Sequence, residues 1–171
     1  MKARWCRAAC ATGSFCVLSV GLLGSMVLVT GAPMLFPSLG PTAYLLALRP
    51  DAPSASPRNT VVGHGIGVLC GVLALLVCGL WGAPGSLAHG EMTLLRVLAA
   101  ALALGGTGFV MVLADRSHPP AGATTLIVAL GLMPGSAALV ALMASVVGLV
   151  LLGQAFGLVA GARPSGWAPD G

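Results

Sequence analysis

The residues best suited to chemistry in this sequence form a compact group of His, Pro, Gly and Thr past the middle of the chain. The stretch from Ser117 to Thr125 reads Ser-His-Pro-Pro-Ala-Gly-Ala-Thr-Thr. Its histidine can donate a hydrogen bond or change charge near neutral pH, and its threonine hydroxyls can also donate. Its glycine removes the side chain where a small solute would approach the backbone. The combination is typical of a site that binds a small solute.

A weaker copy of this stretch lies earlier in the chain, where residues 36–43 read Phe-Pro-Ser-Leu-Gly-Pro-Thr-Ala. At an offset of 82 positions, the residues that match the later stretch and its continuation are Pro37, Gly40, Thr42, Ala47 and Leu48. Each copy follows a long apolar segment and opens an apolar run shorter than the roughly 20 residues of a membrane span. The pair predicts two breaks in an otherwise helical frame.

The predicted substrate-binding residues come from both breaks and one neighbouring span: His118, Pro119, Pro120, Gly122, Thr124, Thr125, Gly40, Thr42 and His64. A helix that begins inside a membrane presents its first backbone N–H groups and the positive end of its dipole, which suit an anion. A purely structural alternative exists, because Pro and Gly also kink helices. His118 has the alternative of a bond to a neighbouring carbonyl or to Asp115, and His64 that of a packing residue.

Composition sets the class of protein. The chain has 171 residues, of which 57% are hydrophobic and only 7% are charged. A soluble domain carries roughly 25% charged residues, so this chain lacks the charge to cover a water-facing surface. The composition predicts a polytopic, all-α transmembrane helix bundle in a lipid bilayer. Its net charge of +4 is scattered along the sequence, whereas nucleic-acid binding requires a basic patch.

The elements that must position the candidate residues are four long spans and two short broken or half helices. The long spans are predicted at 11–35, 61–81, 93–114 and 137–159, and the short runs at 36–48 and 117–133. They form two three-helix repeats, 12–81 and 93–160, within one domain over 1–171 that has short polar termini. The alternative for the first span is a signal peptide, with Thr30-Gly31-Ala32 as the cleavage site.

The basic residues favour six passages through the membrane over four. Six passages leave only Arg96 on the side opposite the N-terminus, and gather on the other side Lys2, Arg4, Arg7, Arg49, Arg58, Arg116 and Arg163. The positive-inside rule then predicts a plasma (inner) membrane protein with both termini in the cytoplasm. Six passages also relate the two repeats by inverted topology, which is common among secondary transporters.

Two helix faces of small residues are predicted to let another helix approach closely. They consist of Gly63, Gly67 and Gly71, and of Gly153, Gly157 and Gly161. Both internal packing and a homo-oligomer use such faces, and the sequence does not decide between them.

Catalytic and metal-binding functions have little support in the sequence. It contains no HExxH motif, nucleophile elbow or Walker motif, and its acids, Asp51, Glu91, Asp115 and Asp170, form no catalytic pair. The five cysteines include no pair of CxxC units and no histidine at ligand spacing, which favours apolar packing or free thiols. We therefore expect no enzyme, no metal and no cofactor.

Taken together, these motifs resemble the HPP family of integral membrane proteins, which is named after the triplet His118-Pro119-Pro120. The resemblance also rests on residues 36–43 and on Pro57-Arg58-Asn59, and it covers roughly residues 12–160. It implies a fold usually described as four spans. Cyanobacterial and plastid members are linked to nitrite transport, so the resemblance makes nitrite the leading candidate for the small monovalent anion. The alternative is a non-transporting membrane subunit that scaffolds or regulates a partner.

Overall fold

The structure is a computed structural model that describes residues 2–85, 92–133 and 135–159. All elements in these ranges are helical: α1 (Lys2–Thr30), α2 (Leu39–Leu48), the 3-10 helix η1 (Pro53–Ala55), α3 (Pro57–Val77), α4 (Leu94–Leu113), α5 (Ala121–Ala129) and α6 (Gly135–Val159). Four apolar segments are long enough to cross a membrane: Ala8–Thr30, Pro57–Val77, Leu94–Leu113 and Gly135–Gly157. The predicted all-α bundle of four long spans and two short helices is confirmed. His89 and the predicted polar tail lie outside the described residues.

Two boundaries differ from the predicted ones for local reasons. Helix α1 ends at Thr30 rather than near residue 35, because Gly31 adopts a left-handed φ of 68°, a conformation that commonly ends helices. Helix α3 begins at Pro57, four residues before the predicted start. Proline is well suited to the first helical position, and the Ser56 side chain caps the helix by accepting from the Asn59 N–H at 3.2 Å. The segment between the first short run and the second long span is correspondingly shorter than predicted.

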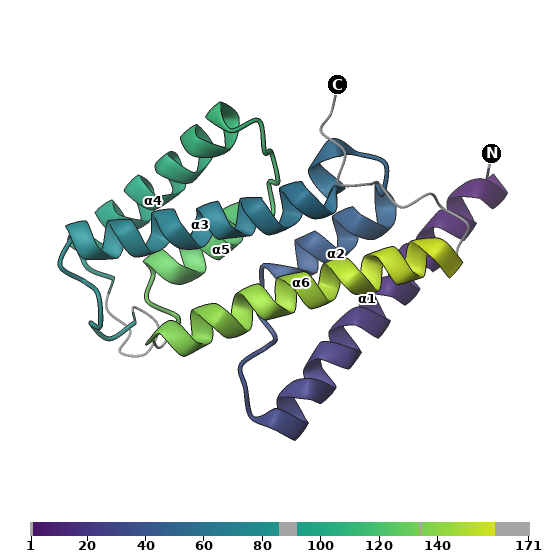
Figure 1. Cartoon of the computed structure of the whole chain (residues 1–171), viewed down its shortest axis with the longest axis horizontal. Helices are drawn as coiled ribbons and strands as arrows, with labels where there is room; N and C mark the ends of the chain where they lie inside the picture. The colour runs from purple at the N-terminus through teal and green to yellow at the C-terminus, as the bar shows by residue number, and fades with distance from the viewer. Residues whose placement is uncertain (1, 86–91, 134, 160–171) are drawn as a thin grey trace.

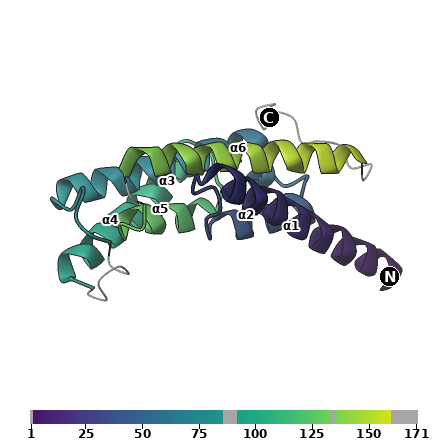
Figure 2. The same ribbon diagram turned by 90° about the horizontal axis from the view of Figure 1, so that it is seen from below.

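The two short helices begin near the centre of the bundle and run in opposite directions (Figures 1 and 2). In Figure 1, α2 runs toward the end of the molecule that holds the start of α1, and α5 runs toward the start of α6. Helices α1 and α3 run from that first end, whereas α4 and α6 run back toward it. These directions are the ones that an inverted pair of three-helix units requires; the duplication itself stays a prediction.

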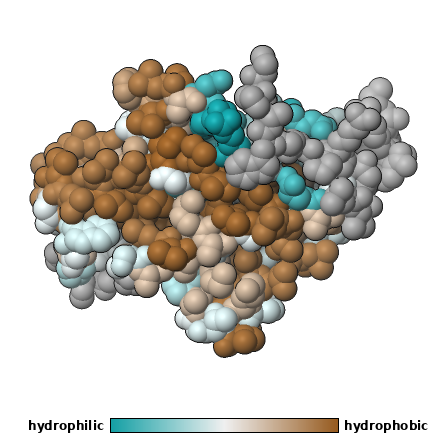
Figure 3. All heavy atoms as spheres, viewed as in Figure 1, coloured by the Kyte–Doolittle hydropathy of each residue, from teal (hydrophilic) through white to brown (hydrophobic). Residues whose placement is uncertain are grey.

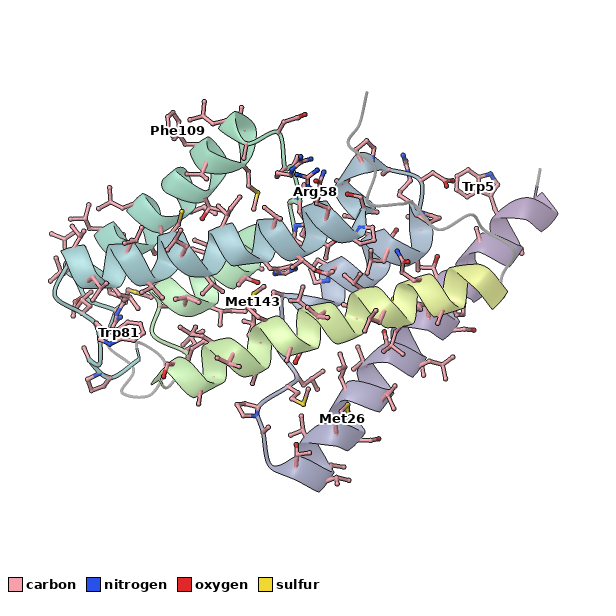
Figure 4. All side chains as sticks on the ribbon, in the orientation of Figure 1. Trp5, Met26, Arg58, Trp81, Phe109 and Met143 are labelled. Carbon is pink, nitrogen blue, oxygen red and sulfur yellow. The ribbon has the colours of Figure 1, made fainter. Side chains whose placement is uncertain are left out.

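Basic residues gather at the end of the bundle where α1 begins. Arg49, which follows α2, lines a pocket there together with Trp5 on α1. Arg116, which follows α4, donates from Nη1 to Asn59 Oδ1 in the first turn of α3 at 3.4 Å. Arg58 belongs to the first turn of α3, and Figure 4 shows it beside the start of that helix. Each short helix and the segment before it therefore lead from one end of the bundle to the other, while the six passages through the membrane stay a prediction.

Arg96 lies at the opposite end, where it holds the end of α5. Its side chain is buried, and Nη2 donates to the Pro84 carbonyl at 2.9 Å while Nη1 donates to the Ala129 carbonyl at 3.5 Å. Ala129 is the last residue of α5, so a cation lies at the negative end of that helix dipole. The guanidinium thereby ties α5 to the segment that follows α3.

The glycine face of α3 packs inside the molecule. A Cβ atom at Gly63 would lie 2.7 Å from His118 Cβ, and one at Gly67 would lie 2.8 Å from the Ala121 carbonyl oxygen. A Cβ atom at Gly71 would lie similarly close to a side chain of α5. The predicted close approach is therefore made by α5 and the segment before it. On α6, Gly153 also packs internally, against side chains of α1 and α2.

The outer surface is suited to lipid. Figure 3 shows hydrophobic residues over most of the visible face, and exposed large side chains include Leu28, Phe109 and Val140. Trp5 and Trp81 are both partly exposed and lie toward opposite ends of the molecule in Figure 4. Tryptophan favours the two membrane–water interfaces. The surface is therefore that of a protein in contact with a lipid bilayer.

Candidate functional site

Four of the predicted site residues meet in one buried group between α2, α3 and α5. His64 comes from α3 and His118 from the segment just before α5, while Thr42 and Thr124 come from the first turns of α2 and α5. Each of these four side chains is 0% exposed. We call them the His–Thr cluster.

Hydrogen-bond distances connect the cluster across both short helices. Thr42 Oγ1 lies 3.0 Å from His64 Nε2 and 3.5 Å from His118 Nε2. The centroids of the two imidazole rings are 5.0 Å apart. On the other side of its ring, His64 Nδ1 lies 2.7 Å from Thr124 Oγ1. A single side chain of α3 therefore links the first turns of α2 and α5.

The partner of His118 fixes the position of its proton. His118 Nδ1 lies 2.7 Å from the Ser54 carbonyl oxygen. A carbonyl oxygen only accepts hydrogen bonds, so Nδ1 carries the hydrogen and donates it. In the neutral ring Nε2 is then an acceptor. Because the Thr42 hydroxyl lies closer to the Ser38 carbonyl, at 2.9 Å, and to His64 Nε2, at 3.0 Å, than to His118 Nε2, at 3.5 Å, the lone pair of His118 Nε2 is left without a short hydrogen bond.

Two members of this surrounding were not predicted from the sequence. Thr60 Oγ1 is fully buried and lies 3.4 Å from His118 Nδ1. Thr60 precedes His64 by four residues on α3, and helix periodicity places such a pair on one face, so the spacing could have predicted Thr60 as a site residue. Nothing in the sequence indicates the Ser54 carbonyl as a partner of His118. It depends on a turn that Asn59 stabilises by donating from Nδ2 to the Pro53 carbonyl at 3.0 Å.

Thr125 forms a separate polar contact outside the His–Thr cluster. Its Oγ1 lies 2.9 Å from Thr107 Oγ1 on α4 and donates to the Ala121 carbonyl at 3.1 Å. Both threonine side chains are buried. The pair joins α5 to α4, and Thr107 was not among the predicted site residues.

The remaining predicted residues do not reach the cluster with side chains. Gly40 is exposed, and a Cβ atom there would meet nothing within 4 Å. Gly122 faces Leu104 on α4, whose Cδ1 would lie 3.4 Å from such an atom. Pro119 is exposed and Pro120 is half-buried. These residues shape the backbone around the two breaks, which leaves direct contact with a solute to the histidines and threonines.

The starts of the short helices are closed by local backbone bonds. The N–H groups of Ala121 and Gly122 donate to the carbonyls of His118 and Pro119, both at 3.0 Å. The N–H group of Leu39 at the start of α2 is bonded in the same way. The expectation of free N–H donors at these ends is therefore wrong for these groups, because a tight turn precedes each helix. Among the described residues, the buried side-chain atom left without a hydrogen-bond partner is Ser38 Oγ, one residue before α2.

The carboxylates in the described part of the chain do not belong to the His–Thr cluster. Asp51 and Asp115 are both exposed. Within the described ranges, no group of three or more His, Cys, Asp or Glu side chains lies close enough to hold a metal ion. What surrounds the imidazoles is a set of hydroxyls and a carbonyl, which can bind a small polar or charged solute through hydrogen bonds.

Comparison with known proteins identifies the chain at the level of its family. The chain matches the family described as HPP, transmembrane region, over residues 2–164. No curated protein and no solved structure matches it. The match includes the His118-Pro119-Pro120 triplet and every helix of the bundle. With its four apolar spans, the chain is a multi-pass membrane protein that belongs to the HPP transmembrane family.

Proposed function

We propose that this protein is a transporter or channel for a small monovalent anion in the plasma (inner) membrane, with nitrite as the leading candidate. The observation that carries the proposal is the His–Thr cluster, a fully buried polar group where two short helices begin inside an apolar bundle. Polar side chains within a membrane are costly and usually mark a path for solutes or ions. Interrupted helices near the midplane mark such sites in many secondary transporters.

The local electrostatics favour an anion over a cation. The first turns of α2 and α5 both lie at the cluster, and each helix dipole adds up to about half a positive charge at its N-terminus. The hydroxyls of Thr42 and Thr124 can turn from their present partners to donate to a bound anion. The described acids are exposed rather than near the rings. A cation would therefore lack a counter-charge, whereas an anion would gain donors and a favourable field.

The structure shows the cluster in a closed arrangement. Because His64, His118, Thr42 and Thr124 are all 0% exposed, a solute reaches them only after neighbouring elements separate. The non-helical residues 31–38 and 114–120 precede the short helices and are the segments that such a movement would involve. The proposed transport therefore requires such a movement to open the cluster to the solute.

The test of the proposal is anion uptake into liposomes that contain the purified protein. Nitrite, nitrate, formate and chloride are compared, with protein-free liposomes as background. We expect saturable uptake of nitrite by the native protein and its loss in Thr42→Val, which removes the hydroxyl between the two rings while keeping the side-chain shape. Thr12→Val is the matched control, since Thr12 is a buried threonine on α1 outside the cluster.

Two results decide the outcome. If folded Thr42→Val and folded Thr12→Val took up nitrite equally, the cluster would not lie on the transport path. No uptake of any anion by the folded native protein would contradict transport and favour the alternative function, a membrane subunit that scaffolds or regulates a partner.

A further inference from the structure

The His–Thr cluster contains two imidazoles that share one hydroxyl, an arrangement able to move a proton. A hydroxyl has a single hydrogen to donate. Thr42 Oγ1 nevertheless has three neighbours within hydrogen-bond distance: the Ser38 carbonyl at 2.9 Å, His64 Nε2 at 3.0 Å and His118 Nε2 at 3.5 Å. Its hydrogen can therefore change partner without any movement of the backbone.

Two neutral arrangements satisfy His64. In the first, Thr42 donates to the Ser38 carbonyl, His64 donates from Nε2 to Thr42, and Thr124 donates to His64 Nδ1. In the second, Thr42 donates to His64 Nε2, and His64 donates from Nδ1 to Thr124. The heavy-atom positions are the same in both, so they differ only in where hydrogens lie. Such a chain of groups can pass a proton along.

An added proton has a defined entry point. His118 Nδ1 already donates to the Ser54 carbonyl, so the proton binds the free lone pair of His118 Nε2. From there it passes to Thr42 Oγ1 as the Thr42 hydroxyl hydrogen passes to His64 Nε2. His64 then holds hydrogens on both nitrogens and donates from Nδ1 to Thr124, while His118 returns to its neutral form. The proton that enters forms one new N–H bond. Each later transfer along the relay breaks one bond to hydrogen and forms one, so no other reactant is needed.

A protonated ring at this depth needs a negative partner. A buried cation is costly unless a counter-charge lies beside it. The described groups that contact the rings are neutral. They are hydroxyls from α2, α3 and α5, and the Ser54 carbonyl in η1. Of the charged neighbours in sequence, Asp115 is exposed and Arg116 donates to Asn59. Among the described residues, none therefore offers an anion to a protonated ring.

We infer that the His64–Thr42–His118 relay binds one proton together with one anion, so that the solute crosses the membrane as a proton–anion pair. The inference rests on the proposed function and adds the coupling ion to it. By linkage, an anion beside the rings favours their protonation and a proton favours anion binding to the same degree. Ser38, whose carbonyl accepts from Thr42, also has a buried hydroxyl without a partner among the described residues, which is a further donor for the bound anion. Transport is then electroneutral and follows the pH gradient rather than the voltage.

The test measures proton and anion movement in the same liposomes. Nitrite uptake is recorded together with the lumenal pH, reported by a trapped pH-sensitive dye, under an imposed pH gradient or an imposed potassium diffusion potential. Protein-free liposomes correct for nitrous acid that crosses lipid unaided. We expect about one proton per anion, acceleration by an acid exterior and no response to voltage. His118→Asn should lose both fluxes, whereas His89→Gln, which changes the third histidine of the sequence, should keep both.

The outcomes separate the coupling from the transport itself. Anion uptake that follows voltage and leaves the lumenal pH unchanged would overturn the coupling and leave the proposed function intact. The absence of any anion flux would overturn both.

A second measurement does not depend on flux or on a variant that folds. The ring nitrogens of isotope-labelled histidines report protonation by NMR in the membrane-embedded native protein. We expect added nitrite to raise the pH at which one of the buried rings takes up a proton. The same titration with and without nitrite would overturn the inference.

Discussion

At the scale of single residues, the site is organised by hydrogen bonds whose direction can be deduced. The Ser54 carbonyl forces His118 to carry its hydrogen on Nδ1, because a carbonyl cannot donate. Thr42 then lies between an acceptor on His118 and a nitrogen on His64 that can play either role. Thr42 is therefore placed to exchange a hydrogen with either ring.

Two substitutions of His118 separate its structural bond from its chemistry. The amide nitrogen of asparagine lies near the position of Nδ1, so His118→Asn keeps a donor for the Ser54 carbonyl at 2.7 Å. Glutamine places its amide near Nε2, so His118→Gln leaves that carbonyl without its donor. Loss of a partner for a buried polar group costs about 1–3 kcal/mol. We expect thermal unfolding in detergent to show a lower Tm for His118→Gln than for His118→Asn, with uptake lost in both.

Equal Tm values for these two variants would show that the bond to Ser54 contributes little. Retained uptake in His118→Asn would show that the second ring nitrogen, Nε2, is not needed.

At the scale of helices, α3 is the platform on which the site is built. Its glycine face lets α5 and the preceding segment lie against the backbone, and the same face carries Thr60 and His64 toward the cluster. Because α5 has only nine residues, its position depends on this contact and on Arg96 at its far end. Stability and function are therefore coupled through one helix face.

Adding a methyl group to that face should displace α5. In Gly67→Ala the new Cβ would lie 2.8 Å from the Ala121 carbonyl oxygen and 2.9 Å from Thr125 Oγ1, closer than packed atoms tolerate. Overpacking of this kind costs about 1–3 kcal/mol, so we expect a lower Tm and reduced uptake. Gly65→Ala is the matched control on the same helix, since a Cβ there meets nothing within 4 Å. Equal Tm values for the two variants would contradict the packing of α3 on α5.

The helices could be predicted from the sequence more completely than the site. Long apolar runs and Pro-Gly breaks sufficed for the four spans and two short helices, because length and hydrophobicity decide them. The start of α3 was missed since Ser56 and Pro57 form a capped beginning inside a segment that is polar by composition. His118, Thr42 and Thr124 were predicted from the repeated motif and His64 from the neighbouring span, but their contacts depend on how α2, α3 and α5 pack.

The missed residues show what a sequence does not contain. The Ser54 carbonyl becomes a partner of His118 only through the turn before α3, and Arg96 becomes a cap for α5 only when the two ends meet. The closed N–H groups at the helix starts also follow from turn geometry. The contacts of Ser54 and Arg96 join residues far apart in the chain, whereas the N–H bonds are local but depend on a turn.

At the scale of the whole molecule, the bundle has two chemically different ends. The start of α1, the end of α2 and the start of α3 share one end with Arg49, Arg58 and Arg116. Arg96 lies at the other end. An asymmetry of this kind sets orientation in membranes, and it predicts that the basic end faces the cytoplasm.

Labelling of introduced cysteines tests this topology. In a functional variant without native cysteines, Asp51→Cys and Asp115→Cys both replace exposed residues. We expect a membrane-impermeant maleimide to label both in inside-out vesicles and neither in intact cells, with an N-terminal tag accessible from the same side. Labelling of these positions in intact cells, with the tag inside, would contradict six passages and support four.

The central claim is that the buried His–Thr cluster lies on the path of an anion. The most direct measurement compares nitrite uptake by the native protein with uptake by the double variant His64→Gln/His118→Asn, each reconstituted at equal density and shown to be folded. We predict saturable uptake by the native protein and background uptake by the double variant. Equal uptake by the two proteins, or none by the native protein, would contradict the claim.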